Sequence, residues 1–166
     1  MVKSKMPFTP FHLGPAILIG LLFFPLIDII IICIASVIVD IEPAYYLFFT
    51  QRGPYHGLLH TYLAATIISF LLTLIMYPLR NKYPKLLGFF GLKQETNHKR
   101  MLISALIGTY SHIFLDSFLY PEMHPFYPIR GNVMLYALSP ITVYGICILS
   151  FLLAGIIYVI RIIWGK

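Results

Sequence analysis

The sequence predicts an all-α, polytopic integral membrane protein with about five helices, folded as a single membrane-embedded domain over residues 1–166. Hydrophobic residues make up 59% of the 166-residue chain and charged residues only 11%, a balance that is too apolar for an ordinary soluble domain. Long apolar stretches alternate with short polar segments, which is typical of helices that cross a bilayer. The sequence shows no internal repeat, so we expect one domain.

The first apolar run extends from Phe11 to Ile41 and is too long for one comfortable span. Pro25, which Asp28 follows, interrupts it, and proline disfavours a continuous helix. The preferred interpretation is a short N-terminal helical hairpin, with helices at about 11–24 and 26–42. Such helices are only about 21 to 25 Å long, which is short enough for a re-entrant pair. A single kinked helix is the alternative.

Three later segments are apolar over about the 20 residues that a membrane span requires. They are Leu59–Leu79, Met101–Tyr120 and Leu135–Ile160. Between the first two lies a polar segment, Arg80–Arg100, that contains six basic residues. Together with the hairpin, these segments give about five helices.

The basic residues predict the orientation in the membrane. In the hairpin arrangement, the N-terminus and the loops 43–55 and 121–134 share one face, and the segment 80–100 and the C-terminus share the other. Four Lys and Arg residues lie on the first face and eight on the second, so the second is predicted to be cytoplasmic. A single kinked helix changes the count to two against ten but moves His12 to the opposite face.

The same distribution of charge argues against a nucleic-acid partner. The net charge is +6, but the basic residues lie in the termini and connecting segments, as is usual in membrane proteins. We therefore expect membrane lipids to be the partners of this chain.

Histidine and carboxylate side chains collect at the predicted extracytoplasmic ends of the helices. Two pairs have i, i+4 spacing, which places both members on one face of a helix. The pairs are His112 with Asp116 and His56 with His60, and the remaining members are His12, Asp40 and Glu42. Imidazole and carboxylate groups are the usual ligands of zinc and related metals. The cluster thus predicts a metal site, although each pair alone is also compatible with a hydrogen bond or interfacial packing.

Two further ionisable residues follow in a proline-rich loop. Glu122 and His124 are close in sequence to Asp116, but their loop context favours solvation. We expect both to lie at the rim of the site.

Four short motifs occur in order within the first 130 residues. They are TPFHLGPA at 9–16, SVIVDIEP at 36–43, QRGPYHGLLH at 51–60 and GTYSHIFLDSF at 108–118. This series resembles the membrane-bound metal-dependent hydrolases, whose bacterial members include LexA-regulated inner-membrane proteins. The resemblance implies that the metal ligands and their immediate neighbours are His12, Asp40 with Glu42, His56, and His112 with Asp116.

The chain departs from that family pattern at two positions. Gln51 stands where the family often has a histidine, and Gly57 where it has a serine. A ligand or supporting group is therefore either absent or replaced by His60. The order of the motifs is also similar to that of the zinc-dependent phospholipases C, which implies phosphoester chemistry on lipids.

The resulting hypothesis is a hydrolase that cleaves a phosphoester or ester bond of a lipid or lipid-linked substrate. One or two divalent ions, with zinc as the expected metal, would be held by His12, Asp40, His56, His112 and Asp116. Coordination lowers the pKa of water towards about 7 and polarises the scissile group. Either Asp40 or Asp116 is suited to bridge two ions.

Four other residues receive provisional roles. Glu42 is the first candidate for the general base, and His60 for a supporting group or a replacement ligand. Arg52 and Arg130 lie in loops on the same predicted face, where they are weaker candidates for holding a lipid phosphate. Snorkelling of both arginines to lipid headgroups is the alternative.

Other classes of protein fit the sequence less well. An intramembrane metalloprotease commonly carries H-E-x-x-H, in which the glutamate activates water, and HGLLH has no glutamate. A divalent metal-ion transporter, or a metal-binding membrane protein without hydrolytic activity, would use the same ligands. The absence of an inverted repeat and the crowding of ligands at one depth argue against the transporter. A purely structural membrane protein is the third alternative.

Overall fold

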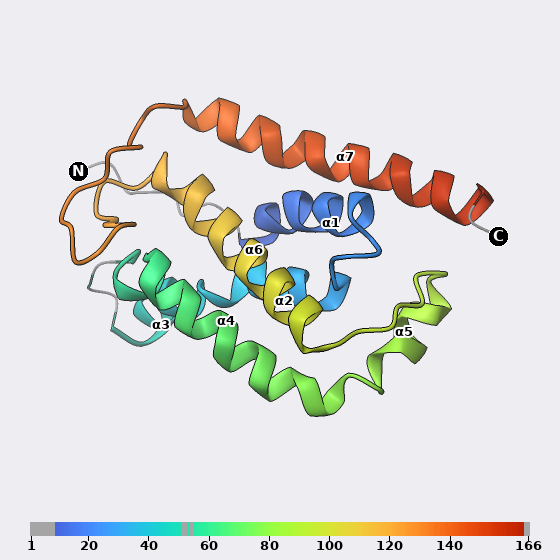
Figure 1. Cartoon of the computed structure of the whole chain (residues 1–166). Coiled ribbons are helices and arrows are strands. Elements are labelled where there is room, and N and C mark those ends of the chain that lie inside the picture. Colours follow the sequence, from blue (N-terminus) through green and yellow to red (C-terminus); the bar gives the residue numbers. More distant parts are fainter. Residues whose placement is uncertain (1–8, 51–52, 54, 165–166) are drawn as a thin grey trace.

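A computed structural model describes residues 9–50, 53 and 55–164, and within these residues the chain is helical and forms no strand (Figure 1). The main helices are α1 (Leu13–Leu22), α2 (Ile29–Ile38), α3 (Ile41–Tyr45), α4 (Tyr62–Met76), α5 (Tyr83–Phe89), α6 (His98–Ser117) and α7 (Pro140–Trp164). Short helical turns adjoin them: the 3-10 turns η1 (Thr9–His12), η3 (Leu58–His60) and η4 (Tyr77–Leu79), and the π-helix η2 (Tyr46–Thr50). The all-α prediction is confirmed for this part of the chain.

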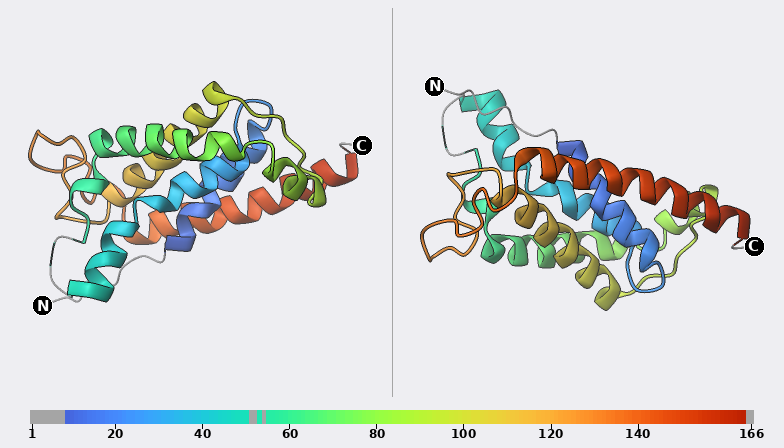
Figure 2. Two further views of the ribbon diagram at one scale, coloured as in Figure 1. Left: turned by 90° about the horizontal axis from the view of Figure 1, so that it is seen from below. Right: turned by 90° about the horizontal axis from the view of Figure 1, so that it is seen from above.

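Helix α6 lies between α4 and α7 in the view of Figure 1. It packs on α2 and α4, while α7 packs mainly on α1 (Figure 2). One apolar cluster, which includes Ile31, Leu72, Met101 and Ala105, joins α2, α4 and α6. The inward face of α6 is therefore buried, and that face also carries His112 and Asp116.

The first two helices form a hairpin, and α1 and α2 pack against each other (Figure 1). The two-helix interpretation thus describes this segment better than one kinked helix, although both helices are shorter than the expected 11–24 and 26–42. Helix α2 starts at Ile29 because Oδ1 of Asp28 accepts a hydrogen bond from the backbone N–H of Ile31 at 3.1 Å, which is an N-terminal cap.

Two side chains from the region that precedes and starts α6 hold the turn between α1 and α2. Gln94, which is buried, donates through Nε2 to the carbonyl groups of Phe24 and Ile27 at 2.9 and 3.0 Å. The Arg100 guanidinium donates to the same two carbonyl groups. A buried backbone carbonyl without a partner costs about 1–3 kcal/mol, so these contacts stabilise the turn.

The segment 43–55, expected to be a loop, is instead helical as far as Thr50. Helix α3 follows α2 after a bend of 45°, and η2 continues from it. The expected end of the second helix at residue 42 is wrong, because α2 ends at Ile38 and Pro43 is the third residue of α3. A backbone N–H has no partner within the helix at that position, so proline is tolerated there.

Helix α6 begins and ends three residues earlier than the expected Met101–Tyr120. The Asn97 side chain accepts a hydrogen bond from the Arg100 N–H at 2.9 Å and caps the start of the helix. At the other end, Nδ2 of Asn132 donates to the carbonyl groups of Ser117 and Tyr120. A distant residue therefore satisfies carbonyl groups that a longer helix would have paired internally.

Helix α7 begins at Pro140, five residues later than the expected Leu135. Proline suits the first position of a helix, and Oγ of Ser139 accepts a hydrogen bond from the N–H of Thr142 at 3.2 Å. Residues 118–139 consequently form a long connection of turns. The polar segment 80–100 also contains α5, which the sequence interpretation did not include.

Two helical segments are long and apolar enough to cross a membrane, namely Tyr62–Leu79 with 18 residues and Pro140–Trp164 with 25. The bent pair formed by residues 29–50 makes a third if it acts as one span. Helix α6 is 20 residues long, but polar residues at its start and on its buried face reduce its hydropathy. A bundle of five spans therefore stays a prediction.

Gly108 marks the closest approach of α6 to α2. A Cβ atom at this position would lie 2.6 Å from Cβ of Ala35 and 2.7 Å from the carbonyl oxygen of Ile32. We expect Gly108→Ala to lower the free energy of unfolding by about 1–3 kcal/mol, measured by thermal unfolding in detergent. Gly155→Ala in α7 is the control, because among the described residues no neighbouring atom lies within 4 Å of a Cβ added there. Equal effects of the two substitutions would contradict the packing explanation.

Candidate metal centre

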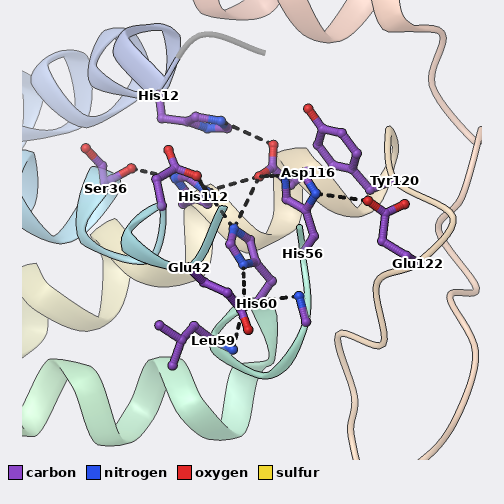
Figure 3. Close-up of polar contacts among 12 residues, drawn as sticks. His12, Ser36, Glu42, His56, Leu59, His60, His112, Asp116, Tyr120 and Glu122 are labelled. Carbon is purple, nitrogen blue, oxygen red and sulfur yellow. Dashed lines mark hydrogen bonds and ion pairs between the residues drawn. The ribbon is translucent and has the colours of Figure 1, made fainter. Parts of the chain in front are cut away.

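The predicted cluster assembles at the C-terminal half of α6, between the start of α1, the end of α2 and the turn before α4 (Figure 3). Its members are His12, Asp40, His56, His60, His112 and Asp116. All are buried except Asp40, which is partly exposed. Six residues from four separate parts of the chain thus share one small volume.

Asp116 is at the centre of this cluster. Its Oδ1 lies 3.2 Å from Nε2 of His12, and its Oδ2 lies 3.0 Å from Nε2 of His112. The Nε2 atoms of His56 and His60 each lie 3.9 Å from the same Oδ2. Four imidazole rings therefore direct Nε2 towards one carboxylate.

Asp40 adds a second carboxylate to the centre. Its Oδ1 lies 3.4 Å from Nε2 of His112 and 3.6 Å from Nε2 of His60. Asp40, His60, His112 and Asp116 each offer one ligand atom, and these four atoms all lie within 4.8 Å of one another. A tetrahedral zinc site with bonds of about 2.0–2.2 Å has ligand atoms about 3.3–3.6 Å apart, so the spacing fits a metal ion after small side-chain adjustments.

Contacts on the far side of three rings determine which nitrogen faces the centre. They join His112 Nδ1 to the carbonyl oxygen of Ser36 at 2.6 Å, His60 Nδ1 to Oε2 of Glu42 at 3.0 Å, and His56 Nδ1 to Oε1 of Glu122 at 3.1 Å. A carbonyl or carboxylate oxygen only accepts hydrogen bonds, so Nδ1 carries the proton and Nε2 of the neutral ring carries a lone pair. Metal-binding histidines in proteins are oriented in this way.

At the centre of the cluster, hydrogen-bond acceptors consequently lie next to other acceptors, with no donor from the described part of the chain between them. Nε2 of His60, Nε2 of His112 and both carboxylate oxygens of Asp116 are buried and have no hydrogen-bond partner among the described residues. Each unpaired atom costs about 1–3 kcal/mol unless a proton or a cation lies between the two acceptors. The residues present therefore fit a divalent cation.

The charge around His60 supports the same conclusion. Burial alone would lower the pKa of this ring, but the carboxylates of Asp40 and Glu42 outweigh burial and raise it. The electrostatic field that favours an added proton on the ring also favours a metal ion.

His56 and His60 do not lie one turn apart on a helix, as the spacing predicts. His56 is in a turn, whereas His60 ends the 3-10 turn η3, and α4 starts only after Thr61. The reason is that Oε2 of Glu42 accepts hydrogen bonds from the N–H groups of Gly57 and Leu59, at 3.0 and 3.1 Å. The chain folds around this carboxylate, and both rings still reach the cluster.

Glu42 therefore has the contacts of a positioning residue. The same oxygen that holds Gly57 and Leu59 also accepts from Nδ1 of His60. These three contacts favour a role in orienting His60 over the general-base role expected from the sequence.

Two residues outside the expected ligand set, Glu122 and Tyr120, support His56. Glu122 was expected to be solvated, but it is only partly exposed and contacts Nδ1 of His56, and this hydrogen bond lowers the pKa of Glu122. The Tyr120 ring stacks on His56 with 3.5 Å between ring centroids. Pro121, directly after Tyr120, was a signal that the chain turns back here. His124 is exposed, as expected.

Of the two arginines proposed for phosphate binding, the structure describes only Arg130. Arg52 and Gln51 lie outside the described residues. Arg130 is exposed in the loop after α6.

Comparisons of the chain with protein-family models, with curated proteins and with solved structures found no match. The fold and the site define a helical protein with a buried histidine and aspartate cluster that could hold a metal ion. Two of its helical segments have the length and composition of membrane spans.

Proposed function

We propose that the protein is an integral membrane hydrolase that uses a divalent metal to cleave a phosphoester or ester bond of a lipid or lipid-linked substrate. The observation that carries this proposal is the convergence of four imidazole Nε2 atoms on Asp116. Three of these rings are also oriented by a hydrogen bond from Nδ1 to an oxygen acceptor. Nitrogen and oxygen donors of this kind suit zinc. The resemblance of the motifs to membrane-bound hydrolases supports the same reaction class.

The geometry supports one ion and allows a second. Asp40, His60, His112 and Asp116 form the tightest group and would hold the first ion. Oδ1 of Asp116 faces His12, while Oδ2 faces the other rings. Asp116 is therefore suited to bridge two ions, with His12 and His56 completing the second site.

A cation in this site would lower the pKa of a coordinated water and polarise the scissile ester. Hydrolysis adds the water oxygen to phosphorus or to the acyl carbon, and the water proton passes to the oxygen of the leaving alcohol. Asp40 is the partly exposed member of the cluster and is suited to hold this proton in transit. Glu42, Glu122 and the Ser36 carbonyl keep the rings aligned.

The orientation of the protein is part of the proposal. The basic segment 80–100 lies at the opposite end of the molecule from the loop 118–139, which is adjacent to the cluster (Figure 1). If basic segments are retained in the cytoplasm, the cluster lies near the extracytoplasmic face.

The test is metal-dependent turnover by the full-length protein in detergent. We expect bound zinc in the purified protein, together with cleavage of a phospholipid or lipid phosphate that a chelator stops and added zinc restores. His112→Ala should lose both properties. His98→Ala is the control, because His98 is exposed at the other end of α6 and stacks on Tyr77. Absence of chelator-sensitive turnover on every lipid ester would contradict hydrolysis.

A divalent metal-ion transporter, or a metal-binding membrane protein without hydrolytic activity, is the second candidate. The deep burial of His60, His112 and Asp116 favours it, because a buried site restricts access of a large substrate. Metal flux into proteoliposomes without lipid turnover would support a transporter, and stable metal binding without either activity would support a storage or structural role.

A further inference from the structure

We propose that the end of the helical bundle opposite the metal cluster binds an anionic membrane lipid, with its headgroup at Lys99 and Arg100 and an acyl chain along α6. A cavity of about 740 Å³ lies there, between the end of α1 with its following turn and the N-terminal half of α6. This site is separate from the metal cluster and does not depend on the hydrolase proposal.

The lining of this cavity is divided into a polar and an apolar part. Its charged side chains, Glu95, Lys99 and Arg100, all come from the start of α6 and the segment before it. The apolar part includes Ile19 of α1 and Ile103 and Ile107 of α6. A ligand that fills both parts needs a polar headgroup joined to a hydrocarbon chain.

The polar part favours a negative headgroup, because its lining includes two positively charged residues and only one carboxylate. The Arg100 guanidinium is fixed by its hydrogen bonds to the carbonyl groups of Glu95 and Ile27, and its Nε is buried without a partner among the described residues. Lys99 is exposed on the same rim. A lipid phosphate accepts hydrogen bonds from such groups, and basic pockets between membrane helices bind anionic headgroups.

A second groove extends the apolar part along α6. It has a volume of about 760 Å³, shares Ile107 with the first cavity, and continues past Leu106, Tyr110 and Phe114. From Arg100 to Phe114 the helix rises about 21 Å, which exceeds the roughly 15 Å half-thickness of a hydrocarbon core. The two grooves together offer room for an acyl chain that starts at the basic rim.

A lipid fits this cavity better than a soluble anion does. A free phosphate group would contact Lys99 and Arg100 but would leave the apolar surface around Ile103 and Ile107 exposed. The segment 80–100 also brings six basic residues to this end of the chain, which favours proximity to anionic lipids.

The experiment measures binding of a fluorescent, chain-labelled phosphatidylglycerol to the full-length protein in detergent, with the matching phosphatidylcholine as the neutral lipid. We expect phosphatidylglycerol to bind at least about fivefold more tightly, and Lys99→Glu to remove this preference. Lys93→Glu makes the same charge change at an exposed position of the same segment that is not part of the cavity lining, and it should keep the preference. Ile107→Trp should weaken the binding of both lipids, because the larger side chain fills the part that the two grooves share.

Three results would overturn the proposal. The first is equal affinity for the two lipids. The second is an equal loss of the preference for phosphatidylglycerol in Lys93→Glu and Lys99→Glu. The third is displacement of phosphatidylglycerol by inorganic phosphate alone, which would indicate a soluble-anion site. Because the measurement needs no bound metal, each of these results leaves the hydrolase proposal untouched.

Discussion

Replacing Asp116 with asparagine is expected to reduce metal affinity by more than about 100-fold, beyond the 10- to 100-fold that loss of a supporting contact causes. Asp116 contacts all four imidazole rings, and its negative charge offsets that of the cation. An amide has one acceptor oxygen and lower affinity for zinc. The measurement is zinc titration against a competing chelator, together with the metal content of the purified protein.

The same substitution separates a metal site from a structural ion-pair cluster. In a metal site, the asparagine amide can donate to the unpaired Nε2 of His112. The metal-free variant should therefore unfold at the same temperature as metal-free wild type, or at a higher one. In a structural cluster held by charged rings, removing the carboxylate would cost about 3–5 kcal/mol. A large loss of stability with unchanged metal content would contradict the metal site.

Asp28→Asn provides the matched control. Asp28 and Asp116 are each only 1% exposed, but Asp28 lies at the α1–α2 turn and caps α2. An asparagine oxygen can still accept the hydrogen bond from Ile31, so we expect this variant to retain full metal content.

Replacing Glu42 with alanine is expected to weaken metal binding by about 10- to 100-fold and to lower the free energy of unfolding by at least about 2 kcal/mol. The physical reason is that one carboxylate oxygen accepts from Gly57, Leu59 and His60. Without it, two backbone N–H groups lose their acceptor and the His60 ring loses its orientation. Zinc titration and thermal unfolding measure the two effects.

Glu42→Gln distinguishes positioning from proton transfer. Glutamine keeps an acceptor oxygen, so a positioning residue should retain most of the stability and a measurable fraction of the metal affinity and turnover. A general base would keep the metal and lose turnover almost completely. The second pattern would restore the role that the sequence assigned to this residue.

The helical class could be predicted from the sequence. So could the gathering of Asp40, His112 and Asp116, whereas His60, expected as a supporting group or replacement ligand, is the fourth member of the tightest group, and His12 and His56 are outside it.

Apolar runs of helical length predicted α4, α6 and α7, although their ends depend on contacts that come from elsewhere in the chain. Asn132, for example, satisfies carbonyl groups at the end of α6. Proline was an uneven guide, because Pro43 lies in the first turn of α3 where a helix end was expected, and α7 starts only at Pro140.

The supporting contacts of the site were harder to predict than its central residues. His112 and Asp116 are adjacent on one helix, so their spacing alone places them together. The acceptor for His112 is a backbone carbonyl group, which has no signature in the sequence. Glu122 reaches His56 only because the loop after α6 folds back, and the HGLLH segment is bent by hydrogen bonds to a distant glutamate.

The hydrogen bond from His112 to Ser36 joins residues 76 positions apart, and Gly108, one turn before His112, sets the distance between the two helices that carry them. The correct amino acids are therefore not enough to make the site, because α2 must already be seated on α6 before the His112 ring is oriented. Metal binding and the packing of α2 on α6 would then be coupled. The amount of metal retained on purification would serve as a direct gauge of the fraction of chains that have assembled correctly.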